Sequence, residues 1–292
     1  MKIMLLGCDT PLGLALTRII EQQKRHECVS LSLSESRFKN ERSAKKWIKR
    51  VAGDCLVDLR LEATLDNREH LHELDIARTR WFGKACKRND ILYLCQSSAW
   101  VYSGQPGSAP YDENDLPDNH DGATLGMLLR EAEAALFEMA PQFILLRLAP
   151  VFSSGGGTML SKLLHRFARG EKTAMSDAQF FNPISADDAA RVMAGILDQL
   201  ACGSLNRGVY HYGSNERASY FEFGEAIYAA ASQFVDLDSG GVVRSSDGSQ
   251  PQGDWTLSSQ RLFDHFGIHP APWRPLLAPA VKAFFQHQLK RK

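Results

Sequence analysis

Short apolar runs alternate with longer amphipathic stretches through the first half of this chain of 292 residues. The apolar runs are Ile3–Leu6, Cys28–Leu33, Cys55–Leu59, Ile91–Leu94 and Phe143–Leu148, and the amphipathic stretches are Leu12–Ile20, Ala44–Val51, Leu71–Cys86 and Gly126–Met139. Strands buried on both faces read as continuous apolar runs, and parallel strands need crossover helices between them. The alternation therefore predicts an α/β fold with a doubly wound, mainly parallel sheet of the Rossmann type.

The pattern changes after Val151, where Gly155-Gly156-Gly157 predicts a flexible break. Later elements are predicted as helices at Met159–Phe167, Ala186–Leu200, Tyr220–Ala231, Ser258–Phe266 and Pro279–Leu289, a strand at Val209–Tyr212, and a polar, turn-rich stretch at Asp236–Gly253. We expect residues 1–150, together with 176–212, to form a dinucleotide-binding core. Residues 151–175 and 213–292 are expected to form a smaller C-terminal substrate lobe.

The charges balance, with 34 Lys plus Arg against 34 Asp plus Glu. A protein that binds mainly the DNA or RNA backbone carries an excess of basic residues, so we expect no nucleic-acid partner. The charge is nevertheless distributed unevenly along the chain. Residues 37–50 hold seven basic side chains and one acidic side chain, and residues 112–121 hold five acidic side chains and no Lys or Arg. A solvated helix face is the simplest interpretation of the basic segment.

No run of about 18 apolar residues is present, so we expect no membrane-spanning helix. Asp9 and Pro11 interrupt the first apolar run too early for a signal peptide, which predicts a cytoplasmic protein. The six cysteines are scattered without CxxC spacing. We expect them to be reduced, buried side chains, and we predict no metal site.

The first apolar run leads into a glycine turn, Gly7-Cys8-Asp9-Thr10-Pro11-Leu12-Gly13, and then into a predicted helix. Such a turn forms a phosphate cradle, because free backbone N–H groups and the positive helix end favour an anion. Gly7, Thr10, Leu12 and Gly13 are the candidate cofactor contacts, although close helix packing would require the same glycines. Thr10 stands where a glycine would let a pyrophosphate approach, and it could instead cap the helix. Beyond the second strand, Arg37 permits NADP, where an acid would select NAD.

Several later segments carry a more specific signal. They read Gln96-Ser97-Ser98-Ala99-Trp100-Val101-Tyr102-Ser103-Gly104, Pro110-Tyr111-Asp112-Glu113-Asn114-Asp115, Gln179-Phe180-Phe181-Asn182-Pro183, Gly208-Val209-Tyr210-His211, Ser219-Tyr220-Phe221-Glu222-Phe223, and Leu262 to Ile268 followed by Trp273-Arg274. Together they resemble the motifs of the dTDP-4-dehydrorhamnose reductase family, extended short-chain dehydrogenases that bind sugar nucleotides. The resemblance spans nearly the whole chain. It implies NADP or NAD as cofactor and a homodimer as a possible assembly.

The chain departs from this family at its catalytic motif, Y-G-x-S-K-x-x-G-E. Aligning that motif on Glu133 places Leu125 at the Tyr position and Leu129 at the Lys position. In the family, the Tyr hydroxyl protonates the substrate carbonyl as hydride arrives, and the Lys ammonium lowers the pKa of that Tyr. Leucine can do neither. Ser98 is therefore the one retained member of the implied catalytic set.

The resemblance also implies contacts on either side of the catalytic position. The residues retained on the substrate side are Tyr102, Arg147, Asn182, Pro183, His211 and Trp273. Ordinary core packing is the alternative explanation for each of them. On the cofactor side, Arg60 and Glu62 stand where the family has small residues beneath the dinucleotide, and with Thr10 they make three departures.

Three functions fit these observations. The first is a catalytically degenerate family member that serves as a binding or regulatory module for a nucleotide-type ligand or a protein partner. The second is an active NADPH-dependent nucleotide-sugar reductase or epimerase with a relocated acid, for which His120, Asp121 and Tyr111 are the nearest candidates. The third is a structural or interaction protein with an empty cleft. The loss of both Tyr and Lys favours the first.

Overall fold

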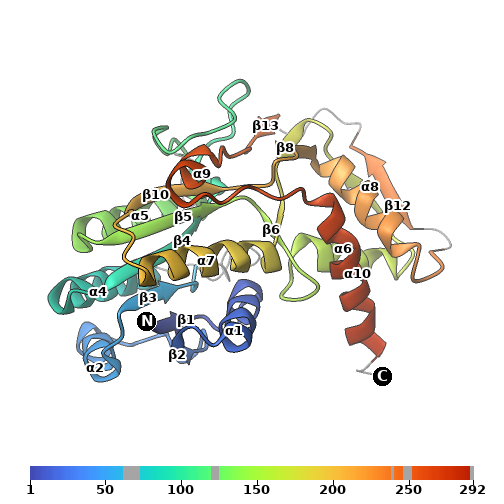
Figure 1. Ribbon diagram of the computed structural model, residues 1–292. Coiled ribbons are helices and arrows are strands. Elements are labelled where there is room, and N and C mark those ends of the chain that lie inside the picture. Colours follow the sequence, from blue (N-terminus) through green and yellow to red (C-terminus); the bar gives the residue numbers. More distant parts are fainter. Residues whose placement is uncertain (62–72, 120–124, 238–239, 246–251, 290–292) are drawn as a thin grey trace.

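A six-stranded parallel sheet forms the centre of the protein in the computed structural model, which describes residues 1–61, 73–119, 125–237, 240–245 and 252–289 (Figure 1). Its strand order is β10-β5-β4-β3-β1-β2, and every neighbouring pair is parallel. The strands are β1 (Lys2–Leu6), β2 (Glu27–Leu31), β3 (Cys55–Asp58), β4 (Leu92–Ser98), β5 (Phe143–Leu148) and β10 (Gly208–Tyr212). The predicted doubly wound α/β fold is confirmed.

Helices cover both faces of this sheet, because alternate side chains of each strand point to opposite sides. On one side, here called the α1 face, Leu94 of β4 belongs to the apolar cluster beneath α1 (Pro11–Gln23) and α7 (Ala186–Ala201). On the other side, the α5 face, Tyr93 belongs to the cluster beneath α2 (Glu41–Val51), α4 (Glu73–Asn89) and α5 (Leu125–Met139). Each strand therefore contributes to two separate cores.

The chain changes direction across the sheet at β1, which lies between β2 and β3. Open α/β sheets bind ligands outside the carboxyl ends of the strands at such a point. We call this region, at the carboxyl ends of β1 and β3, the switch-point site. It is where the glycine turn between β1 and α1 lies.

A smaller group of elements packs beside the sheet, on the right of Figure 1. Its helices α6, α8 and α10 enclose a third apolar cluster, which includes Phe152, Phe223 and Trp273. The elements outside the main sheet are η1 (Ala99–Val101), β6 (Val151–Phe152), α6 (Met159–Phe167), β7 (Lys172–Met175), β8 (Gln179–Phe181), β9 (Ile184–Ser185), β11 (Ala218–Ser219), α8 (Tyr220–Ala231), β12 (Gly241–Arg244), β13 (Gly253–Asp254), α9 (Gln260–Phe266) and α10 (Arg274–Leu289). The third cluster joins Phe152 and α6 to α8 and α10, whereas Leu262 and Phe266 of α9 belong to the cluster on the α1 face.

The structure corrects the prediction in two places in the C-terminal third. The last helix begins at Arg274 rather than Pro279, which lies inside it. A proline inside a helix removes one backbone hydrogen bond, and here the helix continues through it. The stretch 236–253, expected to lack regular structure, contains β12, which pairs with β7, and the start of β13, which pairs with β8. Strands this short give little periodicity among glycine and serine.

The cysteine prediction is wrong for Cys202, which is exposed, whereas Cys55, Cys86 and Cys95 are buried. In the described part of the chain, no group of His, Cys, Asp or Glu side chains could hold a metal ion. Among the same residues, no helix combines the length and apolar character needed to cross a membrane.

Candidate functional site

The glycine turn at the switch-point site is shaped by close backbone contacts. Gly7 has a φ of +81°, and a Cβ built on it would lie 3.1 Å from the carbonyl carbon of Leu59 in the neighbouring turn after β3. A Cβ on Gly13 would lie 2.1 Å from the carbonyl oxygen of Gly7. Both glycines are therefore required by packing of the turn and helix, whether or not a ligand binds.

Thr10 caps α1 instead of projecting into the switch-point site. Its Oγ1 accepts a hydrogen bond from the Gly13 N–H at 3.0 Å and donates to the Gly7 carbonyl at 2.9 Å, and the residue is 2% exposed. This is the helix N-cap arrangement, which satisfies one of the free N–H groups of the first turn. The departure from glycine at this position therefore stabilises the helix end.

The turn supplies few N–H groups to a phosphate. The Gly7 and Cys8 N–H groups donate to the Leu31 carbonyl, and the Thr10 N–H donates to the Gly7 carbonyl. Pro11 at the first helical position has no N–H at all. Since phosphate binding at a helix N-terminus depends on such donors, a dinucleotide would fit the backbone shape here with fewer phosphate contacts than a glycine-only turn offers.

Two other features border the turn. The glycine loop after β6 lies against Pro11, since a Cβ on Gly156 would come within 2.3 Å of the proline Cγ. Leu12 is fully buried in the cluster beneath α1, and Arg37 is exposed beyond β2. Gly7 and Gly13 therefore shape the turn with both of their N–H groups already bonded within the protein, and Arg37 beyond β2 is an exposed charged side chain available to a phosphate.

Helix α5 carries apolar side chains at both catalytic positions of the family motif. Leu129 is 0% exposed within the cluster on the α5 face, and Leu125 is half-buried against the same cluster. Gly126 is retained, because a Cβ there would lie 2.2 Å from the Trp100 carbonyl oxygen. Ser98, at the end of β4, is 0% exposed, and its Oγ accepts from the Trp100 N–H at 3.3 Å. At positions 125 and 129 the helix therefore contributes core packing through leucine side chains.

A buried polar network joins α5 to strands β4, β5 and β10. Arg147 donates from Nε and Nη2 to the Glu133 carboxylate at 3.1 and 2.7 Å and from Nη1 to the Tyr102 hydroxyl at 2.8 Å. Ser97 donates to the same carboxylate at 2.6 Å. The Tyr102 hydroxyl lies 3.2 Å from Nε2 of His211. The network brings together three predicted substrate contacts, Tyr102, Arg147 and His211, each at most 2% exposed.

Burial and neighbouring charge shift the pKa values of His211 and Tyr102 in this network. Burial and the neighbouring Arg147 cation lower the pKa of His211 to about 3, so its ring is neutral. Nδ1 lies 3.2 Å from the Tyr111 carbonyl oxygen, which places the ring proton on Nδ1 and leaves Nε2 as an acceptor. Burial also raises the pKa of Tyr102. The contacts hold Tyr102, Arg147 and His211 in fixed positions relative to one another.

The remaining predicted substrate contacts, Asn182, Pro183 and Trp273, are also buried. The Asn182 amide donates to the Ser214 and Leu257 carbonyls, both at 2.9 Å, and accepts from the Leu257 N–H at 3.1 Å. It joins the loop before β9 to two later segments. A ligand-binding role for these residues and for the Tyr102 network stays a prediction.

Arg60, one of the three departures on the cofactor side, is buried. Its side chain is 3% exposed and lies on the α5 face, where Nε and Nη2 donate to Asp58 at 2.9 and 2.6 Å. Tyr93 donates to the same carboxylate at 2.6 Å. Asp58 ends β3, and Arg60 lies in the turn after it, where the bonds to Asp58 hold its side chain on this face. Glu62 lies outside the described residues.

Trp255 contacts the segment that carries Tyr102, and the sequence analysis did not predict this contact. Its ring fills the space beside two glycines, since a Cβ on Gly104 or on Gly253 would come within 2.3 or 2.4 Å of it. Its Nε1 donates to the Tyr102 carbonyl at 3.1 Å, and its ring lies 5.1 Å from that of Trp100. The Gly104 of the recognised segment was the available signal, since a glycine with φ of +74° next to an aromatic ring marks a close approach.

Tyr111, a candidate relocated acid, is 3% exposed and stacked on Tyr102 with ring centroids 4.1 Å apart. Burial raises its pKa, whereas the catalytic Tyr of the family is made more acidic by its Lys. In this structure Tyr111 packs against Tyr102 by ring stacking. The other two candidates, His120 and Asp121, lie outside the described residues.

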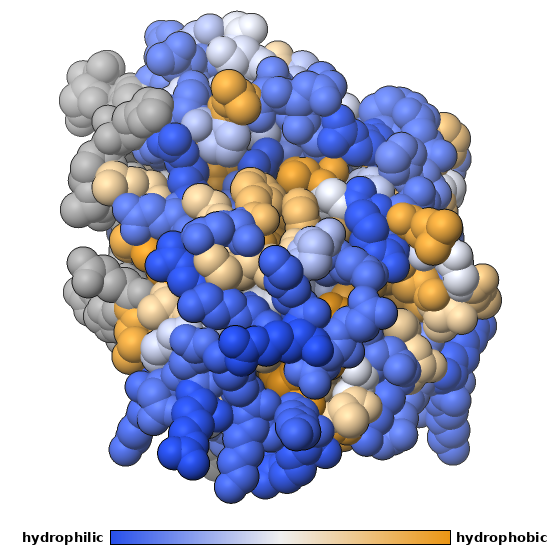
Figure 2. All heavy atoms as spheres, turned by 90° about the vertical axis from the view of Figure 1, so that its left-hand side faces the viewer, coloured by the Kyte–Doolittle hydropathy of each residue, from blue (hydrophilic) through white to orange (hydrophobic). Residues whose placement is uncertain are grey.

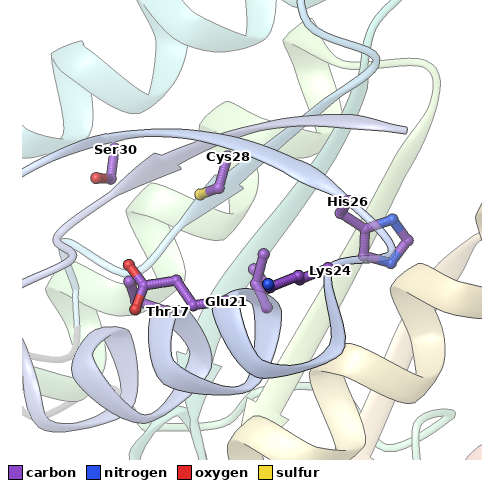
Figure 3. A pocket seen from close by; sticks show the side chains of 7 residues that line it. Thr17, Glu21, Lys24, His26, Cys28 and Ser30 are labelled. Carbon is purple, nitrogen blue, oxygen red and sulfur yellow. The ribbon is translucent and has the colours of Figure 1, made fainter.

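One hollow lined by described residues lies away from the switch-point site. It measures about 250 Å³ and is lined by α1 and the edge strand β2, with Glu21, Lys24, His26 and Cys28 in its wall (Figure 3). These residues belong to the later half of α1 and the early half of β2. The hollow is thus near the amino end of β2, opposite the carboxyl ends where sheets of this kind bind ligands.

The uneven charge of the sequence has two structural outcomes. Helix α2 exposes Arg42, Lys46, Lys49 and Arg50 and buries its apolar side, and the lower part of the face in Figure 2, where α2 lies, is strongly hydrophilic. In the acidic segment, Asp112 and Asp115 are exposed, whereas the partly buried Glu113 accepts a hydrogen bond from the backbone N–H of His211 at 2.8 Å.

The protein has a parallel sheet with a glycine turn at its switch point, Ser98 at the end of β4 and a smaller core beside the sheet. These features are typical of nucleotide-sugar reductases with a Rossmann-type fold. Residues 1–286 match the family model described as RmlD substrate binding domain. The chain therefore belongs to the dTDP-4-dehydrorhamnose reductase family.

Individual relatives agree with this assignment. A dTDP-4-dehydrorhamnose reductase of Aggregatibacter actinomycetemcomitans is 21% identical over 287 residues, which cover 94% of this chain and 97% of that protein. The crystal structure of a Clostridium acetobutylicum dTDP-4-dehydrorhamnose reductase has a TM-score of 0.82 at 16% identity, covering 98% of this chain and 100% of that one. The Bacillus anthracis reductase in complex with NADP has a TM-score of 0.77 at 14% identity, covering 98% and 99%. At such identities the structures establish a shared fold.

Proposed function

We propose that this protein is a catalytically inactive member of the dTDP-4-dehydrorhamnose reductase family that binds a nucleotide-type ligand, NAD(P) or a sugar nucleotide, in a binding or regulatory role. The observation that carries the proposal is the packing of Leu125 and Leu129 against the core on the α5 face. Loss of one well-placed acid–base group typically lowers a rate by about two to four powers of ten, and two are absent here. The neutral His211 and the raised pKa of Tyr111 supply no substitute.

The ligand half of the proposal rests on the switch-point site. Gly7 and Gly13 keep the close backbone geometry of the turn, and the structural relative from Bacillus anthracis is described in complex with NADP. NAD(P) would bring hydride chemistry, but α5 lacks a group to protonate the acceptor. Because Thr10 and Pro11 reduce the free N–H groups, we expect weaker dinucleotide binding than a glycine-only turn would give.

Thermal-shift titration with NADPH, NADH and dTDP tests binding. A ligand that binds only the native state raises the unfolding free energy, by about 2.7 kcal/mol at a hundredfold excess over Kd, so the melting temperature should rise with at least one of these compounds. If none raises it, the protein is a structural or interaction module and the binding proposal is wrong.

A turnover assay with dTDP-4-dehydro-6-deoxymannose and NADPH tests inactivity, and no NADPH oxidation is expected. Turnover that is lost on substitution of His120 or Asp121 would instead support a relocated acid. The double variant Leu125→Tyr with Leu129→Lys tests whether these two leucines are the cause of the expected inactivity. Because Leu129 is fully buried, the lysine is expected to lower stability by several kcal/mol, so Leu125→Tyr alone serves as the folding control.

A further inference from the structure

Gln96 is a fully buried amide on the α1 face of β4. Among the described residues, neither its Oε1 nor its Nε2 has a hydrogen-bond partner, and the residue is 0% exposed. More than about nine in ten buried polar groups in proteins are paired, and an unpaired one weakens the fold. A glutamine with both polar atoms unpaired in the centre of the main sheet therefore calls for an explanation.

The sheet register places Gln96 next to the switch-point site. It lies opposite Leu146 on β5 and, one step beyond the Cys95–Asp58 pair, next to Leu59 on the β3 side. The Leu59 carbonyl is the group that a Cβ on Gly7 would approach to within 3.2 Å. Ser98 follows two residues later on the same face. The amide is thus one strand away from the glycine turn, at the carboxyl end of the sheet.

The two unpaired atoms of Gln96 limit which ligand groups could form hydrogen bonds with it. Nε2 needs an acceptor and Oε1 needs a donor, side by side. A phosphate offers only acceptors and would leave Oε1 unpaired. A planar group with adjacent C=O and N–H, as in a primary carboxamide or the imide edge of a pyrimidine, satisfies both atoms at once.

We propose that Gln96 is a ligand-contacting residue of the switch-point site and that it pairs with the amide or imide edge of a bound nucleotide. This inference rests on the proposed function, since it assigns a contact within the same site. The two sources of that edge are the nicotinamide carboxamide of a dinucleotide and the pyrimidine of a sugar nucleotide.

The test compares Gln96→Met, which keeps the side-chain shape and removes both polar atoms, with the wild type. Removing an unpaired buried amide should raise the melting temperature of the ligand-free protein by about 2–4 °C. Affinity for NAD+ or dTDP should fall by about tenfold. Gln199→Met is the matched control, because Nε2 of Gln199 donates to the Phe266 carbonyl at 2.7 Å and its loss should lower the melting temperature.

The acetylpyridine analogue of NAD+, which lacks the carboxamide N–H, separates the two sources. If the nicotinamide is the partner, wild type prefers NAD+ over the analogue and Gln96→Met abolishes that preference. If the pyrimidine is the partner, only dTDP binding changes.

Two results would overturn the inference while the proposed function stands. One is a melting temperature that falls in Gln96→Met as it does in Gln199→Met, which would show that an internal water or a protein group already satisfies the amide. The other is unchanged affinity for every compound that the wild type binds. If the wild type binds none of these compounds, the proposed function fails and the inference fails with it.

Discussion

Three buried polar side chains of strand β4 differ in their pairing between the two faces of the strand, while a fourth, Ser98, accepts a hydrogen bond from the Trp100 N–H. On the α5 face, the Tyr93 hydroxyl donates to Asp58 and the Ser97 hydroxyl to Glu133, and each carboxylate is also held by an arginine. On the α1 face, Gln96 has no partner among the described residues. The paired side chains stabilise the fold through their mutual hydrogen bonds. An unpaired buried side chain can instead form its hydrogen bonds with a ligand.

This difference separates structural residues from ligand-binding candidates. Tyr102, Arg147 and His211 match the family motifs, yet they contact one another and are buried. Gln96 lies inside the recognised segment and matched no expected role. Burial combined with the partner of each polar atom is therefore more informative here than the motif alone.

The largest change in the unfolding free energy is expected from Arg147→Met, which removes the buried ion pair with Glu133 on the α5 face. The substitution leaves the buried Glu133 carboxylate with Ser97 as its main partner, and breaking a buried ion pair from one side typically costs about 3–5 kcal/mol. Urea unfolding followed by circular dichroism measures the loss. Adding Glu133→Leu should restore most of it, because no unpaired charge then remains. A loss below about 1 kcal/mol for the single variant would show that the network contributes little.

A smaller effect is expected from pH. His211 has its pKa lowered to about 3 in the folded protein, while in the unfolded chain it takes up a proton below about 6.5. The unfolded state therefore binds more protons between these values, and the unfolding free energy falls as the pH decreases. The expected contribution is about 1.4 kcal/mol per pH unit. Unfolding at pH 4.5 to 7.5 should show a shallower slope in His211→Gln than in the wild type, and equal slopes would contradict a neutral His211.

Thr10→Gly should change stability and binding in opposite directions. Losing the Thr10 cap is expected to cost from a few tenths to about 2 kcal/mol, and it frees the Gly13 N–H for a ligand. Calorimetry with NADH should show tighter binding in this variant. Thr10→Ser keeps the capping hydroxyl and is the control. If NADH bound more tightly to Thr10→Ser, or no more tightly to Thr10→Gly than to the wild type, the freed Gly13 N–H would not be the cause of tighter binding.

The smallest effect is expected at the surface. Lys46→Ala and Lys49→Ala on the exposed side of α2 should each change the unfolding free energy by less than about 0.5 kcal/mol, because exposed charges are screened by water and salt. Thermal unfolding at low and high salt measures this. A larger, salt-sensitive change would indicate that the basic segment of α2 stabilises the fold through its charges.

Much of the fold follows from local pattern. The apolar runs at β1, β3, β4 and β5 and the amphipathic helices between them were predictable, because burial on both faces imposes continuous apolar strands. The lobe strands β12 and β13 were not, since their pairing with β7 and β8 depends on residues more than 60 positions away. The Thr10 cap was predicted as an alternative to a cofactor contact, and the structure has it.

The sequence by itself determined the α/β fold and the resemblance to the family, and it has leucine at positions 125 and 129, which the resemblance aligns with the catalytic Tyr and Lys, because each depends on residue type and spacing alone. Only the tertiary structure decided where the polar side chains go. It turned Arg60 away from the switch-point site, joined Arg147 to Glu133 and left Gln96 without a partner. The physical reason is that pairing depends on contacts between distant segments, which strand order and register create and no local pattern records.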